Sequence, residues 1–140
     1  MKNELNQTVS FYASVTDTRP DDANLYDLLV GDTYKSEVLA IRKERNPERQ
    51  KAMKNKLPLF TPSGIFLRSD AKSLLQPTGL ICIDIDGKDN AGANNFDRFK
   101  DLIAAVPYVV YCGLSVRGNG YFCIIPIASP AKFQQHFRAL

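Results

Sequence analysis

The chain has 140 residues, of which 44% are hydrophobic and 24% are charged, and its net charge is +3. This balance fits one globular domain with a buried core and excludes the disordered and fibrous classes. The first residues are polar and the apolar runs are far too short to cross a bilayer, so we expect a cytoplasmic protein with no membrane partner. The three cysteines, Cys82, Cys112 and Cys123, lie in apolar runs without metal-binding spacing and predict buried free thiols.

The N-terminal part of the chain is expected to hold one strand followed by helices. Residues 8–15 alternate weakly between apolar and polar side chains and predict a strand, which could join a sheet formed by the second half. A short helix is expected over residues 22–30 and a longer one over residues 33–45. Asn46 followed by Pro47 is typical of a helix start and predicts a third helix there.

These helices carry a concentrated basic charge. Between residues 42 and 56 there are seven basic side chains and only two acidic ones. A solvated helical face explains any single one of them, whereas their density favours a partner of negative charge such as DNA or RNA. The candidate nucleic-acid-binding residues are Arg42, Lys43, Arg45, Arg49, Lys51, Lys54 and Lys56.

The second half predicts the order of an RRM-like sheet. A short strand is expected at residues 65–67, and from Gly79 the pattern reads as strand 79–86, helix 95–105, strand 108–113, strand 121–127 and a helix from residue 129. This order predicts an α+β fold of the ferredoxin-like, split βαββα(β) type with helices on one face of the sheet. We expect the last strand beyond Leu140, and therefore a single domain cut from a longer protein, with residues 1–56 as an N-terminal segment and residues 57–140 as the core.

The strand at residues 81–86 delivers two carboxylates into a glycine turn. Side chains alternate along a strand, so Asp84 and Asp86 share one face, roughly 6 to 7 Å apart. Two such charges repel each other unless a cation lies between them, which favours a divalent metal site. Asp86 can also be explained as the first residue of a turn, but Asp84 lies inside the apolar run, where an ionised group is costly without a partner.

A tight loop, residues 114–120, joins the last two expected strands. Its length requires a hairpin. Gly118 and Gly120 suit a plain turn, or a backbone nest that exposes amide groups and Arg117 to a phosphate. In a βαββ unit the first strand commonly neighbours the hairpin strand that follows its helix, so we expect this loop and the carboxylates to border one pocket.

Four segments occur in order along the second half: Lys56-Leu57-Pro58, Gly64-Ile65-Phe66 with Arg68, residues 78–86 and residues 115–120. Together they resemble the VirE-like N-terminal domain of bacterial mobile-element proteins, which is similar to the primase-polymerase superfamily of archaeo-eukaryotic primases. The resemblance implies an RRM-like catalytic sheet and nucleotidyl transfer in the replication of a mobile element. The implied partners are a nucleoside triphosphate, DNA or RNA, and a C-terminal helicase-like or primase-associated domain of the parent chain.

The resemblance also implies roles for individual residues. Asp84 and Asp86 match the acidic motif that holds catalytic Mg²⁺ or Mn²⁺, and Ser115, Gly118 and Gly120 match the loop that binds nucleotide phosphates. Phe122 stands where that loop ends in histidine, and the third carboxylate of the family is expected beyond the end of the chain. Asp89 and Asp97 are expected to be structural.

Two other functions remain open. A catalytically inactive nucleic-acid or partner-binding module on the same fold is compatible with the missing histidine. Asp84-Ile85-Asp86-Gly87 also resembles the nucleophile motif of haloacid-dehalogenase-type phosphatases. Lys88 follows that motif in place of threonine, and the short 114–120 link leaves no room for the helical crossover that a parallel sheet needs, so this is the more distant alternative.

Overall fold

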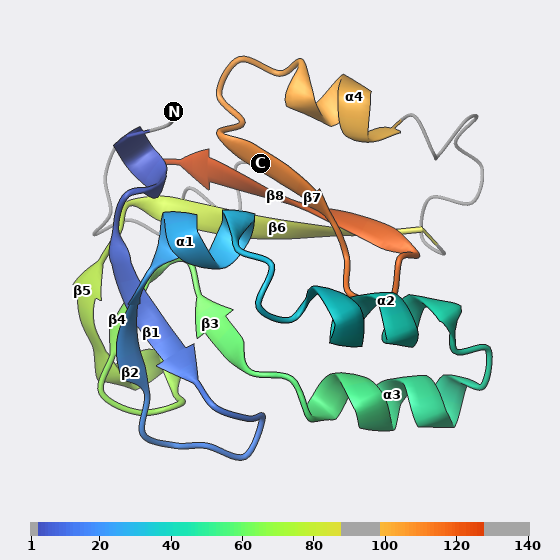
Figure 1. Cartoon of the computed structure of the whole chain (residues 1–140). Helices are drawn as coiled ribbons and strands as arrows, with labels where there is room; N and C mark the ends of the chain where they lie inside the picture. Colours follow the sequence, from blue (N-terminus) through green and yellow to red (C-terminus); the bar gives the residue numbers. More distant parts are fainter. Residues whose placement is uncertain (1–2, 88–98, 128–140) are drawn as a thin grey trace.

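The computed structural model describes residues 3–87 and 99–127 of the chain, and it shows an α+β fold (Figure 1). Three antiparallel sheets have the strand orders β2-β1-β3, β4-β5 and β6-β8-β7. Short helices lie between them. The α+β class predicted from the sequence is therefore confirmed.

The first sheet is formed by β1 (Thr8–Tyr12), β2 (Asp21–Asn24) and β3 (Leu59–Thr61), after a 3₁₀ turn at Asn3–Leu5. β1 pairs with β2 on one edge and with β3 on the other. The strand expected in this region exists, but it does not join the sheet of the second half. The turn that contains Pro20 instead returns the chain antiparallel to β1, so both edges of β1 are occupied.

Three helices separate β2 from β3. They are α1 (Leu25–Val30), α2 (Lys35–Lys43) and α3 (Pro47–Asn55). The predicted start of α3 is confirmed, because the side chain of Asn46 accepts hydrogen bonds from the amides of Glu48 and Arg49 at 3.0 and 3.1 Å. α2 and α3 lie side by side as a helical hairpin below the third sheet (Figure 1).

The second sheet is a hairpin of β4 (Gly64–Phe66) and β5 (Leu74–Pro77), with a 3₁₀ turn at Ala71–Ser73 between them. It is tied to β1 by side chains. The buried Ser10 hydroxyl accepts a hydrogen bond from the Phe66 amide at 2.7 Å, and the Tyr12 hydroxyl donates to the Arg68 carbonyl at 2.8 Å.

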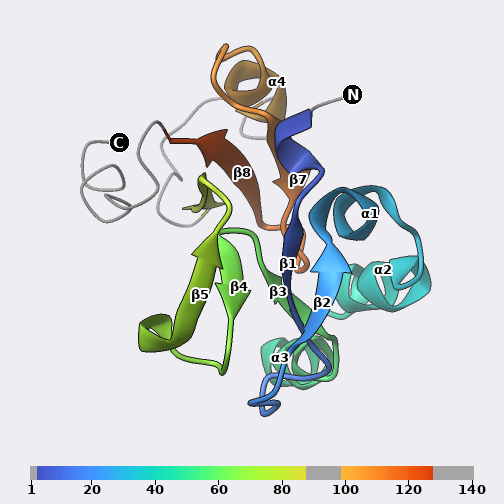
Figure 2. The same cartoon turned by 90° about the vertical axis from the view of Figure 1, so that its left-hand side faces the viewer.

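The third sheet is formed by β6 (Leu80–Asp86), β7 (Tyr111–Leu114) and β8 (Gly120–Pro126). β8 is central and antiparallel to both neighbours. α4 (Phe99–Ala104) connects β6 to β7. Figures 1 and 2 show α4 on one side of this sheet and α1 with the first sheet on the other.

The core joins the third sheet to the N-terminal segment. Leu80 and Ile124 on neighbouring strands are buried against Leu5, Val9 and Leu25. The N-terminal segment, as far as it is described from residue 3 onward, is therefore packed on the sheet of the second half through these residues. The helix expected from residue 129, the first part of the helix expected over 95–105, and Asp89 and Asp97 lie outside the described residues. Within the described ranges, no helix is long and apolar enough to cross a membrane.

Candidate functional site

One face of β6 is buried in the core at the start of the strand and exposed to solvent at its end. Leu80, Cys82, Asp84 and Asp86 share this face because side chains alternate. Leu80 is buried, Cys82 is half-buried, and both carboxylates are exposed. The expectation that Asp84 is desolvated inside an apolar run is wrong, because the N-terminal segment covers only the first half of this face. The carboxylates are therefore open to a ligand and do not need a buried counter-ion.

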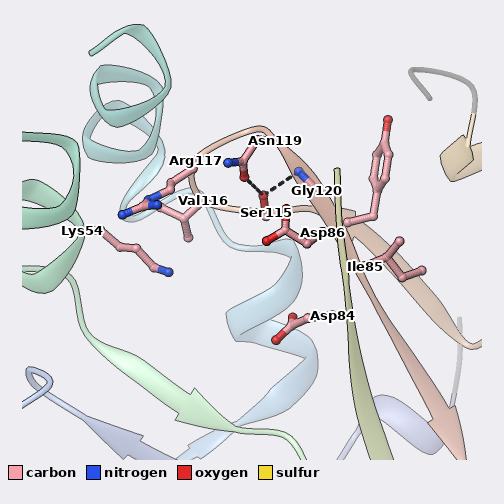
Figure 3. A pocket seen from close by; sticks show the side chains of 10 residues that line it. Lys54, Asp84, Ile85, Asp86, Ser115, Val116, Arg117, Asn119 and Gly120 are labelled. Carbon is pink, nitrogen blue, oxygen red and sulfur yellow. Dashed lines mark hydrogen bonds between the residues drawn. The ribbon is translucent and has the colours of Figure 1, made fainter. Parts of the chain in front are cut away.

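The two carboxylates and the β7–β8 loop border a single pocket of about 230 Å³ (Figure 3). Asp84 and Asp86 come from β6, Ser115 and Arg117 from the loop, and Lys54 from the last turn of α3. Figure 3 shows the Lys54 and Arg117 side chains on the opposite side of the pocket from the two aspartates. The pocket is also lined by Ile85, Val116, Asn119, Gly120 and Tyr121.

Ser115 organises the loop through its backbone and its side chain. Its amide donates to the Gly120 carbonyl at 2.9 Å, and its carbonyl accepts from the Gly118 amide at 2.9 Å. Its hydroxyl accepts from the Gly120 amide at 3.1 Å and lies 3.5 Å from Asn119 Oδ1. The loop is thus a defined hairpin turn, and the Ser115 hydroxyl is already engaged within it.

The two loop glycines have different functions in the structure. Gly120 faces β6: a Cβ atom there would lie 2.5 Å from the carbonyl oxygen of Ile85, so only glycine allows this approach of the two strands. Gly118 has a φ of +80°, which favours glycine. Gly118 does not line the pocket but lies over the side chain of Arg42, whose Cγ would be 3.3 Å from a Cβ at this position.

Residues 52–137, more than half of the chain, match the family model described as "BT4734-like, N-terminal domain". The chain belongs to this family. It is a family of bacterial mobile-element-like proteins, and the match therefore supports the mobile-element part of the resemblance that the sequence motifs indicated. No curated protein and no solved structure matches the chain.

The matched span contains every residue that lines the pocket in this BT4734-like domain. Lys54 lies close to its start, and both the acidic strand and the loop lie inside it. Arg42 lies before it. The pocket therefore belongs to the part of the chain that matches the family model. The contact that Arg42 on α2 makes with the β7–β8 loop comes from outside the matched span.

The basic cluster on α2 and α3 is divided by the structure. Lys54 lines the pocket and Arg42 contacts the loop, with its Nη2 donating to the Ser115 carbonyl at 3.1 Å. The remaining members are exposed and none of them lines this pocket: Lys43, Arg45, Arg49, Lys51 and Lys56. Sequence spacing carried no signal that separates these two groups, because the separation depends on how the helical hairpin packs.

The described carboxylates form a pair and no larger cluster. Within residues 3–87 and 99–127, no group of three or more His, Cys, Asp or Glu side chains lies close enough to hold a metal ion. Two exposed carboxylates on one strand face fit Mg²⁺ or Mn²⁺, since Mg²⁺ commonly keeps several waters and takes its other ligands from one or two carboxylates and a substrate phosphate. They do not fit an ion that needs a full set of protein ligands.

Phe122, at the position of the expected histidine, lies directly across from Asp84 and so shares its face of the sheet. The half-buried ring of Phe122 packs on Tyr111, with 5.6 Å between ring centroids. Gly113 makes room for both rings, because a Cβ there would lie 3.0 Å from each of them. The ring is therefore part of an aromatic pair beside the carboxylates.

The three cysteines are free, but only Cys123 is fully buried. Burial raises the pKa of the Cys82 thiol to about 12, and the neighbouring Asp84 carboxylate adds to this effect. Burial also raises the pKa of Cys112 and Cys123. All three thiols are therefore protonated and poorly nucleophilic at neutral pH. The prediction of free thiols is confirmed for all three, and the predicted burial for Cys123 alone.

Proposed function

We propose that the pocket binds the phosphate groups of a nucleotide together with Mg²⁺ or Mn²⁺, as in a primase-polymerase-like domain. The observation that carries this proposal is the meeting of Asp84 and Asp86 with Lys54 and Arg117 across one open pocket. Carboxylates hold the cation, and basic side chains hold the phosphates that the cation neutralises. The acidic and basic side chains that a metal-nucleotide site needs thus come from different elements and line the same pocket.

Arg117 supplies the second supporting observation. Its Nε is buried and has no hydrogen-bond partner among the described residues. A buried donor without an acceptor costs free energy, and an oxyanion that reaches it removes this cost. A phosphate oxygen is a suitable acceptor because a guanidinium can bind it through two parallel hydrogen bonds.

The charges of the pocket agree with a ligand that brings its own cation. Two carboxylates and two basic side chains line the pocket, so its formal charges balance. A phosphate without a metal would meet the repulsion of both carboxylates at close range. With a divalent cation at Asp84 and Asp86, the pocket becomes positive, and we expect phosphate binding to depend on that cation.

The roles of the residues follow from this arrangement. Asp84 and Asp86 bind the cation, which neutralises phosphate charge and, in a complete active site, activates a primer hydroxyl. Arg117 and Lys54 orient the phosphates, and Ser115 and Gly118 keep the loop in its turn. Gly120 allows the loop to approach β6 closely enough to share the ligand.

The strand order supports the ferredoxin-like part of the proposal. The order β6-β8-β7 is the one that the first three strands of a split βαββαβ unit take, and α4 occupies the first crossover. The same order places the β7–β8 loop beside the end of β6. By contrast, a haloacid-dehalogenase-type site needs the aspartate strand in a parallel sheet, and β6 pairs antiparallel with β8.

Nucleic-acid binding in the replication of a mobile element is the wider function that we infer for the parent protein. The exposed basic side chains lie on or directly beside α2 and α3, the helical hairpin that also carries Lys54, and suit contact with DNA or RNA phosphates. A C-terminal helicase-like or primase-associated domain remains part of this proposal.

A second candidate is a binding module without nucleotidyl transfer. It is favoured by Phe122, which packs on Tyr111 at the position where the resembled superfamily has a phosphate-binding histidine. A site with two carboxylates can bind a metal-nucleotide complex without completing the two-metal arrangement that polymerases use. Template-dependent nucleotide incorporation by the full-length parent separates the two candidates.

The binding itself is tested by titrating ATP into the full 140-residue chain by calorimetry, with and without Mn²⁺. We expect Mn²⁺-dependent binding that is lost in the Asp84→Asn, Asp86→Asn double variant. Asp22→Asn, an exposed carboxylate on β2, is the matched control and is expected to bind like the wild type. Equal binding by the double variant, or binding that needs no cation, would contradict the proposal.

A further inference from the structure

Arg42 connects the N-terminal helices to the pocket loop. It lies in the last turn of α2, and its Nη2 donates to the carbonyl oxygens of Ser115 at 3.1 Å and Leu114 at 3.4 Å. These contacts join residues 72 and 73 positions apart in the sequence. The guanidinium therefore holds the last residue of β7 and the first residue of the loop at the same time.

The stem of Arg42 also fits the turn. Gly118 lies over it, and a Cβ atom added at Gly118 would be 3.3 Å from Arg42 Cγ and 3.5 Å from Cδ. Gly118 needs its positive φ to close the turn, and the Arg42 stem fills the space beneath it. The side chain thus contacts the loop at its entry through hydrogen bonds and near its tip through packing.

Arg42 does not line the pocket that holds the carboxylates, although Ser115 does. Its Nε is buried without a hydrogen-bond partner among the described residues, so its fixed contacts are the two loop carbonyls. The Ser115 carbonyl accepts from both Arg42 and the Gly118 amide. Arg42 therefore acts on the residue that organises the loop and leaves the ligand side of that loop open.

We propose that Arg42 is a positioning residue, which holds the β7–β8 loop in the conformation that binds phosphate. This inference rests on the proposed phosphate-binding function of the pocket. It removes Arg42 from the set of direct nucleic-acid contacts and assigns it to the site. It also makes the site dependent on α2, which lies before the span matched by the family model.

Two variants separate this role from a simple contribution of positive charge. Arg42→Gln removes the charge and the planar donor group. Arg42→Lys keeps the charge but replaces the guanidinium with a shorter ammonium side chain. Lys35→Gln is the matched control, because Lys35 is an exposed basic residue in the first turn of the same helix and lies outside the basic cluster.

The experiment measures loop order and anion binding separately in the full chain. Hydrogen exchange of the Gly118 and Gly120 amides reports the loop without any ligand, since both amides donate to Ser115. Calorimetry with inorganic triphosphate and Mn²⁺ reports binding. We expect Arg42→Gln and Arg42→Lys to exchange both amide hydrogens faster than the wild type and to bind triphosphate about tenfold more weakly. The melting temperature of each variant is measured to establish that it is folded. Lys35→Gln is expected to match the wild type.

The inference is overturned if folded Arg42→Gln exchanges the two amides at the wild-type rate. It is also overturned if Arg42→Lys restores wild-type affinity, because charge alone would then explain the role. If the wild type itself fails to bind triphosphate, the proposed function of the pocket is wrong. In that case Arg42 has no phosphate-positioning role, and amide exchange shows only whether it holds the turn.

Discussion

Asp86 on β6 lies directly across the sheet from Gly120 on β8. A Cβ atom at Gly120 would be 2.5 Å from the Ile85 carbonyl oxygen and 3.3 Å from the Asp86 Cα. The Gly120 amide donates to the Ser115 hydroxyl on its other side. This pair is therefore the point at which the acidic strand and the β7–β8 loop are held together.

Gly120→Ala is expected to force β8 and β6 apart at the pocket. The added methyl group meets backbone atoms that cannot rotate away, so we expect a loss of about 2 kcal/mol in the free energy of unfolding. Urea unfolding followed by circular dichroism measures this loss. Asn119→Ala, an exposed neighbour in the same loop, serves as the control with a change below about 0.5 kcal/mol. A Gly120→Ala protein as stable as the wild type would show that the strands do not approach this closely.

Lys54→Ala is expected to weaken the binding of ATP with Mn²⁺ about threefold to tenfold, because one of the two basic side chains that line the pocket is removed. Lys51→Ala on the same helix is the matched control, since Lys51 is exposed and does not line the pocket. Calorimetric titration at two salt concentrations distinguishes them: only Lys54→Ala should change the affinity. An equal effect of both variants would mean that the general field of the helix, rather than Lys54 itself, attracts the ligand.

Arg117→Lys keeps the positive charge but loses the buried Nε and the planar fork of donors. We expect about a fivefold to tenfold loss of affinity for ATP with Mn²⁺ and no fall in melting temperature, because this Nε makes no hydrogen bond within the described protein. The same calorimetric titration provides the measurement. Full affinity in Arg117→Lys would show that the residue acts as a point charge only.

The parts of the fold that were predicted from sequence are those with strong local signals. The apolar run of β6, the Asn46-Pro47 start of α3 and the short β7–β8 link all appear as expected. The strands that were not predicted lack the apolar alternation and length that mark a strand in the sequence. β2 is the polar stretch Asp21–Asn24, every residue of β5 is exposed, and β3 has only three residues. Such strands are stabilised by their pairing partners, which a single segment of sequence does not contain.

The sequence likewise predicted those site residues that have a local signal and missed the contacts that depend on packing. Asp84, Asp86 and Ser115 are placed by strand alternation and by a short loop, both of which can be recognised from spacing. Lys54 and Arg42 reach the site through the packing of α2 and α3 below the sheet (Figure 1), and no spacing in the chain indicates this. The sequence also predicted a desolvated Asp84, because it could not show where the N-terminal cover of β6 ends.

Tyr12 gives the fold a testable dependence on pH. Burial raises the pKa of its phenol above the usual value of 10, and the nearby carboxylates of Asp70 and Asp17 act in the same direction. Because the folded pKa is the higher one, the neutral phenol stabilises the fold below pH 10, and this contribution is lost as the pH rises above 10. The unfolding free energy of the wild type should therefore fall more steeply from pH 9.5 to about 11 than that of Tyr12→Phe.

At neutral pH, Tyr12→Phe is expected to lose about 1 kcal/mol of unfolding free energy, since its hydrogen bond to the Arg68 carbonyl is lost. Urea unfolding at a series of pH values measures both effects. Parallel pH profiles for the two proteins would mean that the Tyr12 phenol ionises equally easily in the folded and unfolded chains.

The most direct test of the central claim is the coupling between cation and phosphate in the pocket. Electron paramagnetic resonance measures free Mn²⁺ as it is titrated into the full chain, with and without a non-hydrolysable ATP analogue, after correction for the Mn²⁺ that the analogue binds in solution. If Asp84 and Asp86 share one ligand complex with Arg117 and Lys54, the analogue should tighten Mn²⁺ binding about tenfold, and Mn²⁺ should tighten binding of the analogue by the same factor. Independent binding of the two, or no Mn²⁺ binding by the wild type, would contradict a shared metal-nucleotide site.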